Sequence, residues 1–140
     1  MKLLYIDSDI FLDIFLQRDE HYEPASELLS LVDLKKVKAV TTPLVFSNLF
    51  YILQKYRSKS VALKALKTLE QIVGVIPVDD RSVRYALDSK FTDFEDALQY
   101  FSALKSKVTV IVTRNTKDYK TSDIPVFTAK EFLSLYQKRG

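Results

Sequence analysis

Acidic residues crowd residues 92–98, which read TDFEDAL. Thr92 and Glu95 fit a capping box, in which the Thr side chain accepts from the N–H of Glu95 and the Glu side chain reaches back. Asp93 would then lie in the first helical turn, where the helix dipole favours an anion by ~0.3–1 kcal/mol. Asp96 lies on the same helix face as Asp93 and directly precedes an apolar run, so the carboxylate pair is costly unless a cation meets it. A bound metal ion is one candidate for that cation.

Two further polar segments follow β-favouring apolar runs. Asp7 directly follows the first run, and Asn115 lies in the turn after the fourth. Open α/β sheets place their ligands beyond the carboxyl ends of their strands. If the first and fourth strands are neighbours, Asp7 and Asn115 converge with Asp93 and Asp96 in one crevice of oxygen ligands. The alternative for Asp7 is a purely local one, because an Asp at this position can also cap the following helix.

The residue inventory restricts the chemistry of such a crevice. The chain has no cysteine, one histidine and two glycines, of which one is terminal. Disulfides, thiolate catalysis, a cysteine zinc site, a P-loop and a dinucleotide fingerprint are therefore excluded. Oxygen ligands select hard ions such as Mg²⁺ or Mn²⁺, which can polarise a phosphoryl group and lower the pKa of a bound water. Arg114 and Lys117 lie close enough in sequence to hold flanking phosphates.

Strands and helices must alternate to position these residues. The β-favouring runs span residues 2–6, 37–42, 75–78, 108–112 and 124–127. The first run has no polar alternation, which is typical of a strand buried on both faces in a parallel sheet. Helical patterns separate the runs, and no hairpin dipeptide is present. This order predicts one domain over residues 1–140 with a three-layer α/β/α fold around a central parallel sheet of four or five strands.

Capping signals predict several helix ends. Asp79 is expected to begin one helix, and Thr128 and Glu131 to form a capping box at the last one. Gly74 is expected to close a basic amphipathic helix over residues 58–72.

Two polar residues on the expected helices need separate treatment. Asn48 stands in a strongly apolar helix opened by Pro43, and a buried Asn must be hydrogen-bonded, so it either belongs to a site or is satisfied locally. Asp13 follows Asp9 by one helical turn, and we expect it on the polar face.

The overall composition is that of a globular protein. The chain has 140 residues, of which 47% are hydrophobic and 28% are charged, and its net charge is +3. The apolar stretches are too short to span a bilayer, and three aspartates interrupt the first of them, so we expect no membrane segment, no secretory signal and a cytoplasmic location. A mild positive charge is compatible with a polyanionic partner.

Taken together, these segments resemble the PIN domain, the fold of many small Mg²⁺/Mn²⁺-dependent ribonucleases, including VapC-type toxins. Residues 4–9 (LYIDSD) are similar to the family's opening hydrophobic–Asp–Ser/Thr–Asn motif, residues 96–98 (DAL) to its central Asp, and residues 112–115 (VTRN) to its Thr-Arg-Asp turn. The resemblance covers essentially the whole chain. It implies an acidic metal pocket, cleavage of RNA by an activated water, a homodimer and, for toxins, an antitoxin partner.

The chain departs from the family pattern at two positions. Asn48 stands where the family has a Glu, and Asn115 stands where it has an Asp. Each replacement keeps an oxygen but removes a charge. The resemblance then implies an endoribonuclease in which Asp7 and Asp96 are the principal metal ligands, Asp93 binds metal or orients water, and the two asparagines support the site.

Two alternatives remain open at this stage. A degenerate PIN-like domain would bind RNA or a protein partner without cleaving it, which the two missing carboxylates favour. A phosphatase or a receiver domain would instead use an aspartate in the Asp7-Ser8-Asp9 segment as phosphoryl acceptor. The Gly-Thr usual after the second aspartate of such phosphatases is missing here.

Overall fold

Five parallel strands form the centre of the computed structural model, which describes residues 2–139. The strands are β1 (Leu3–Ile6), β2 (Lys38–Thr41), β3 (Gly74–Val75), β4 (Val110–Val112) and β5 (Val126–Phe127). Their order in the sheet is β3-β2-β1-β4-β5, so β1 pairs with both β2 and β4. The predicted parallel sheet is confirmed, and so is the expected contact between the first and fourth strands.

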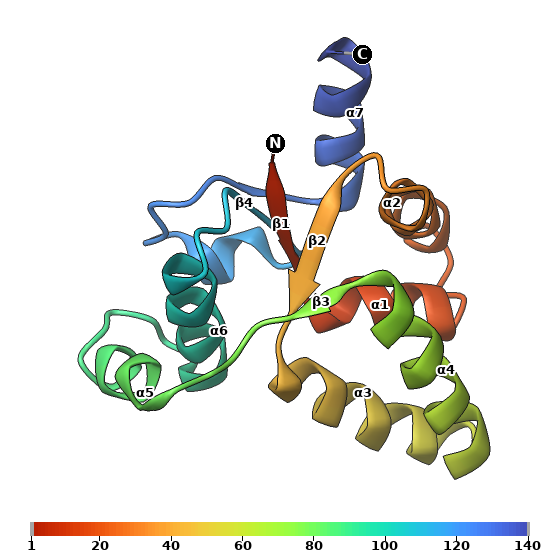
Figure 1. The fold of residues 1–140 in the computed structure, drawn as a ribbon, viewed down its shortest axis with the longest axis horizontal. Helices are drawn as coiled ribbons and strands as arrows, with labels where there is room; N and C mark the ends of the chain where they lie inside the picture. Colours follow the sequence, from red (N-terminus) through yellow and green to blue (C-terminus); the bar gives the residue numbers. More distant parts are fainter. Residues whose placement is uncertain (1, 140) are drawn as a thin grey trace.

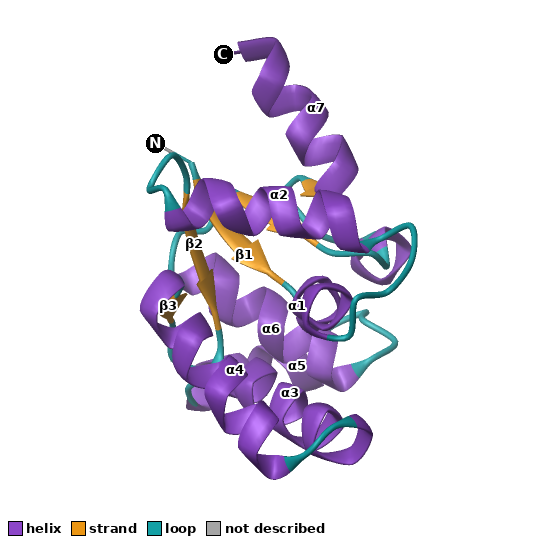
Figure 2. Ribbon diagram, turned by 90° about the vertical axis from the view of Figure 1, so that its right-hand side faces the viewer, coloured by secondary structure: helices purple, strands orange, loops and turns teal. Residues whose placement is uncertain are grey.

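Seven helices of the described chain flank this sheet, and they form its two outer layers. They are α1 (Ser8–Phe15), α2 (Tyr22–Asp33), α3 (Pro43–Tyr56), α4 (Lys59–Ile72), α5 (Asp80–Leu87), α6 (Phe94–Lys105) and α7 (Ala129–Arg139). Helices α5 and α6 lie on one side of the sheet, and α1 to α4 lie on the other (Figure 1). The view turned by 90° shows α2 crossing in front of β1 and β2 (Figure 2). The three-layer α/β/α fold is therefore confirmed, and within residues 2–139 no helix has the length and apolarity needed to cross a membrane.

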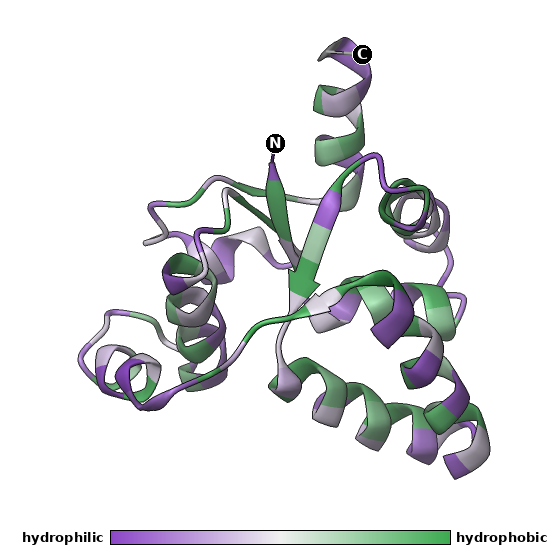
Figure 3. Ribbon diagram, viewed as in Figure 1, coloured by the Kyte–Doolittle hydropathy of each residue, from purple (hydrophilic) through white to green (hydrophobic). Residues whose placement is uncertain are grey.

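The central strands are buried on both faces. In β1, Leu4, Tyr5 and Ile6 are fully buried, and the three residues of β4 are buried as well. Figure 3 shows β1 in the hydrophobic colour over most of its length. Burying a large apolar side chain contributes about 1.5–3 kcal/mol, so β1 and β4 are the rigid base on which the polar residues that follow them are held.

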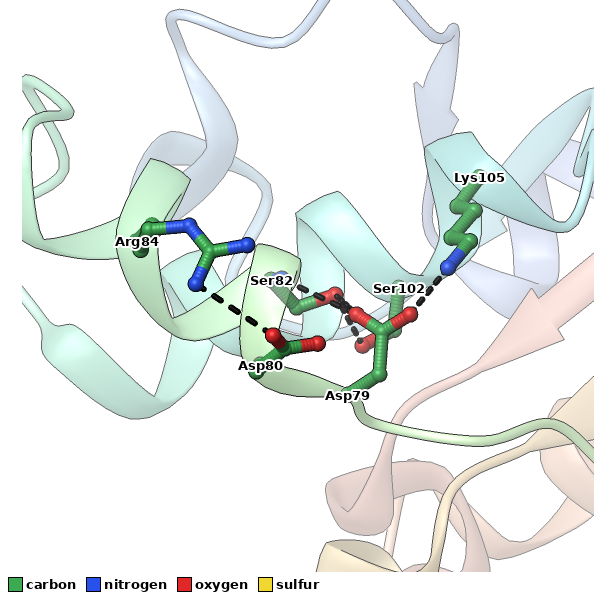
Figure 4. Close-up of polar contacts among 6 residues, drawn as sticks. All are labelled: Asp79, Asp80, Ser82, Arg84, Ser102 and Lys105. Carbon is green, nitrogen blue, oxygen red and sulfur yellow. Dashed lines mark hydrogen bonds and ion pairs between the residues drawn. The ribbon is translucent and has the colours of Figure 1, made fainter.

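A polar cluster fixes helix α6 against α5 (Figure 4). Asp79 caps α5 by accepting from the N–H of Ser82 at 3.1 Å, and it also pairs with Lys105 at the end of α6. The buried Ser102 hydroxyl donates to the Ser82 hydroxyl at 3.3 Å. The bond from Lys105 lowers the pKa of Asp79 to about 2. These contacts hold α6 in place and thereby position the acidic residues at its beginning.

Several predicted helix ends are confirmed. Asp79 caps α5 as expected. At the start of α7 the capping box is complete, because Thr128 N donates to Glu131 Oε1 at 2.9 Å and Glu131 N donates to Thr128 Oγ1 at 3.1 Å.

Two predicted helix ends are wrong. Helix α6 begins one residue later than the proposed capping box of Thr92 and Glu95 requires, because the Asp93 side chain is the cap and accepts from the N–H of Asp96 at 2.9 Å. Gly74 does not close α4, since Val73 caps that helix in an extended conformation and Gly74 already belongs to β3.

Candidate active site

Asp7 lies at the carboxyl end of β1, beside the end of β4. Its backbone N–H donates to Val112 O at 3.0 Å, which places it next to Thr113. Asp7 Oδ1 accepts from Ser8 N at 2.8 Å and caps α1, while Oδ2 accepts from Thr113 Oγ1 at 3.1 Å and from Tyr119 OH at 3.0 Å. Burial raises the pKa of Asp7 although these hydrogen bonds favour its charged form. The capping role and a role in a site are thus compatible, since they use different oxygens.

Asp96 lies in the first turn of α6, in the layer opposite α1 and α3 (Figure 1), and it is half-buried. Burial raises the pKa of Asp96 to about 7, and the next largest causes are the negative charges of Asp7 and Asp93. Asp93 is exposed, and one of its oxygens is engaged in capping the Asp96 N–H. Burial and the charges of Asp93 and Asp7 also raise the pKa of Glu95. The negative charge of Asp7 thus acts on Asp96 and Glu95 of α6, which supports the expectation that Asp7 and Asp96 lie near each other.

Asn48 belongs to this edge of the sheet as well. It is half-buried on α3, and its Nδ2 donates to Ser8 Oγ at 3.2 Å, directly beside Asp7. This bond satisfies the Asn48 amide and also brings the side chain close to Asp7, so it is compatible with both alternatives for Asn48. An open cavity of about 500 Å³ extends from Asn48 between α3 and the beginning of α6. Its lining residues are Leu44, Ser47, Asn48, Tyr51, Phe94, Glu95 and Leu98.

Asp9 is the acidic residue of the site that the sequence analysis did not assign. Its Oδ2 accepts from Arg114 N at 3.1 Å, from Thr113 Oγ1 at 3.3 Å and from Asn115 Nδ2 at 3.3 Å. Its Oδ1 is buried and has no hydrogen-bond partner among the described residues. Burial, followed by the charge of Asp7, raises the pKa of Asp9 to about 7. The sequence signals for this residue are its spacing of two from Asp7 and its place at the end of the segment 4–9 that resembles the opening motif.

Arg114 is held by a buried aspartate on α1. Its Nε lies 3.2 Å from Asp13 Oδ2, and Arg18 Nη1 lies 3.6 Å from Asp13 Oδ1. Asp13 is only 1% exposed, so its expected place on the polar face is wrong. The reason is that α1 is buried over four consecutive residues and the two arginines supply the positive charge. Lys117, in the short 3₁₀ helix Thr116–Tyr119, is exposed.

The donor set of the crevice fits one hydrated hard cation. Among residues 2–139, no three His, Asp or Glu side chains converge closely enough to hold a metal ion by themselves. Mg²⁺, however, typically takes one or two carboxylates and completes its shell with water and substrate oxygens. A cation would relieve the unpartnered Asp9 oxygen and the repulsion that Asp7 exerts on Asp9 and on Asp96.

Comparisons with known proteins give a consistent result. A DNA-bound VapBC complex from Salmonella typhimurium contains a chain with a TM-score of 0.69 and 13% identity, over 92% of this chain and 99% of that chain. For a toxin–antitoxin complex from Klebsiella pneumoniae the TM-score is 0.66 and the identity 20%, over 90% of this chain and 97% of that chain. A third structure is VapC20 from Mycobacterium tuberculosis, described as a sarcin–ricin loop cleaving toxin. Its TM-score is 0.63 and its identity 16%, over 77% of this chain and 86% of that chain.

These structural similarities show a shared fold. A comparison with curated proteins finds no significant sequence match. The sequence model of the PIN domain matches residues 4–117, which include both strands and both acidic segments of the site. The chain therefore belongs to the PIN domain family.

Proposed function

We propose that the chain is a metal-dependent endoribonuclease of the PIN type that acts in the cytoplasm, as the toxin of a toxin–antitoxin pair. PIN domains are generally nucleases and generally use divalent metal ions. The observation that carries the proposal is the convergence of Asp7 and Asp96 from two layers of the fold at the carboxyl edge of the sheet. The pKa values of both carboxylates are raised, chiefly by burial, and shifted carboxylates of this kind are typical of functional sites.

Asp7 and Asp96 are the principal ligands for Mg²⁺ or Mn²⁺ in this proposal. The hydroxyls of Thr113 and Tyr119 hold Asp7 Oδ2 in place from the ends of β4 and the 3₁₀ helix. Asp93 uses one oxygen as helix cap and keeps the other for metal or water. A bound ion supplies Lewis-acid polarisation of the phosphoryl group and lowers the pKa of a bound water.

The remaining polar residues act on the substrate and on the shape of the site. Asn48 holds Ser8 beside Asp7, and Asn115 supports the turn after β4. Arg114, steadied by its ion pair with Asp13, and the exposed Lys117 contact phosphates of the RNA. That the substrate is RNA is supported by VapC20, the structural neighbour described as cleaving the sarcin–ricin loop.

An antitoxin and a second copy of the chain are the proposed protein partners. Structural neighbours include toxin–antitoxin complexes, which supports an antitoxin partner. Helix α3 offers apolar surface for such contacts, because Tyr51 and Tyr56 are 66% and 59% exposed. Large exposed aromatic side chains are enriched in protein interfaces. The homodimer predicts a mass twice that of the 16.2 kDa chain in light scattering.

Cleavage assays with matched variants test the proposal. The purified protein is incubated with transfer, ribosomal and messenger RNA in the presence of Mg²⁺, Mn²⁺ or EDTA. Cleavage is expected only with a divalent ion, and Asp7→Asn and Asp96→Asn should each slow it by about 100-fold or more, because Lewis-acid stabilisation is worth several kcal/mol. Asp33→Asn, at the exposed end of α2, is the control and should cut like the parent. Equal cleavage by Asp7→Asn, or no cleavage of any RNA, refutes the proposal.

The second candidate is a PIN domain that binds RNA or a protein partner without cleaving RNA. It is favoured by Asn48 and Asn115, which carry no charge at the site. Tight RNA binding without turnover in any metal would support it. The phosphatase and receiver-domain alternatives are removed by the membership in the PIN family.

A further inference from the structure

The side chains of Asp9 and Asn115 are in contact at the carboxyl edge of the sheet. Asn115 Nδ2 donates to Asp9 Oδ2 at 3.3 Å, so the first turn of α1 meets the turn after β4. A carboxylate and a carboxamide have nearly the same shape, and both offer oxygens that can bind a cation. Shape alone therefore does not determine which of the two side chains carries the negative charge, while the bonds to Asp9 Oδ2 require an oxygen at that atom of residue 9.

Structural hydrogen bonds account for only one oxygen of Asp9. All three donors, namely Arg114 N, Thr113 Oγ1 and Asn115 Nδ2, point to Oδ2. Oδ1 is buried without a partner among residues 2–139. An unpaired buried acceptor is unfavourable, and more so when it is charged. A role in holding the fold explains Oδ2 and leaves Oδ1 unexplained.

The same hydroxyl group connects Asp9 to Asp7. Thr113 Oγ1 lies 3.1 Å from Asp7 Oδ2 and 3.3 Å from Asp9 Oδ2. A hydroxyl has one proton and can donate to only one of these carboxylates at a time. Asp9 thus places a second negative charge beside Asp7. It lies next to Asn115, whose side chain is uncharged.

We propose that Asp9 is a further acidic residue of the metal-binding site and supplies the charge that Asn115 does not carry. The two side chains act as one carboxylate–amide pair with a single charge, and this charge strengthens the binding of a divalent cation whose ligands are Asp7 and Asp96. This inference rests on the proposed function, because it uses the same cation site.

Three variants test the pair: Asp9→Asn, Asn115→Asp and the exchange of both. The first readout is the affinity for Mn²⁺, measured by calorimetry without RNA, and the second is RNA cleavage. Asp9→Asn should weaken Mn²⁺ binding by about 10-fold or more, the scale of losses at residues that tune a metal site. The exchange variant D9N/N115D should return to within about 3-fold of the parent, since it moves the charge across the pair. Melting curves in EDTA verify that each variant is folded.

The outcomes separate this inference from the proposed function. If Asp9→Asn binds Mn²⁺ like the parent while Asp7→Asn does not, the role of Asp9 is refuted and the proposed function stands. A folded exchange variant that binds as weakly as Asp9→Asn refutes the shared charge, because a merely structural Asp9 predicts no rescue. A parent protein that neither binds Mn²⁺ nor cleaves RNA refutes both proposals.

Discussion

Replacing Asp96 by Asn is expected to stabilise the metal-free protein while removing its response to metal. Without a cation, the Asp96 carboxylate is partly desolvated and is repelled by Asp7, Asp93 and Asp118. The amide has the same shape and no charge, so the repulsion disappears and the packing is kept. A residue of a cation site thus lowers stability until the cation is bound.

The size of the effect follows from the pKa of Asp96. Its rise from 3.8 to about 7 corresponds to a ceiling of about 4 kcal/mol at roughly 1.4 kcal/mol per pH unit. The side chain is only half-buried, so solvent screening reduces the expected gain to about 1–2 kcal/mol. For a chain of this length, that gain raises the melting temperature by about 3–6 °C.

The sign of the pH dependence provides an internal control. The pKa of Asp96 is raised in the folded state. The folding stability of the parent is therefore higher at low pH, where Asp96 is protonated, and it falls as the pH rises through about 7. Asp96→Asn should therefore melt higher than the parent at pH 8 in EDTA, and the difference should vanish near pH 4. Adding Mn²⁺ at pH 8 should raise the melting temperature of the parent only. A variant that is less stable than the parent at pH 8 in EDTA refutes the electrostatic reasoning.

Asp13→Asn is expected to destabilise the fold by about 1–3 kcal/mol in urea unfolding, because Arg114 loses its buried partner; an unchanged midpoint would show that the ion pair contributes nothing. Thr42→Val should lower the free energy of unfolding by about 2 kcal/mol, because Thr42 caps α3 and its hydroxyl donates to the buried Gln99 at 2.5 Å. The control variant Thr42→Ser should keep both bonds. Below pH 7, Mn²⁺ affinity should fall by about tenfold per pH unit, because Asp96 must lose a proton to bind; a flat profile in calorimetry would contradict this.

The sequence predicts the sheet well where a strand is buried on both faces. The apolar runs at β1 and β4 have no polar alternation, and both strands lie in the middle of the sheet. The edge strand β3 is predicted less well, since the expected run is 75–78 and the strand covers Gly74–Val75. Ile76 N still donates to Thr41 O at 2.8 Å, but Pro77 follows and has no N–H to continue the pairing. Strand length thus depends on the neighbouring strand as well as on composition.

The burial of Asp13 depends on a partner that is distant in sequence, and a local sequence pattern cannot reveal it. Asp9 and Asp13 are one helical turn apart, and such a spacing predicts a polar face in an isolated amphipathic helix. Here the neutralising Arg114 comes from the end of β4, about a hundred residues further along the chain. Only the pairing of β1 with β4 brings the two together. The burial of Asp13 is therefore a property of the sheet order.

Asp9 and Asn115 illustrate the same limit within the site. In the sequence, Asn115 is a departure that loses a carboxylate, and Asp9 appears only as the last residue of the segment that resembles the opening motif. Their contact at 3.3 Å is a tertiary feature that the sequence does not reveal. The strand order expected from the sequence brings the Asn115 turn next to the end of β1, as the pairing of β1 with β4 shows, whereas the sequence predicts no role of its own for Asp9 at the metal site.

At this edge of the sheet, the same residues can serve as helix caps and as members of a site. The reason is that three helices, α1, α3 and α6, begin there. Asp7, Thr42 and Asp93 are the caps of α1, α3 and α6. A capping bond needs one oxygen, and a carboxylate has a second one that remains free for other partners. The helix N-termini also favour negative charge by ~0.3–1 kcal/mol each, which partly offsets the repulsion among the acids. Capping therefore does not argue against a cation site here, because it holds the carboxylates in position and lowers the cost of bringing them together.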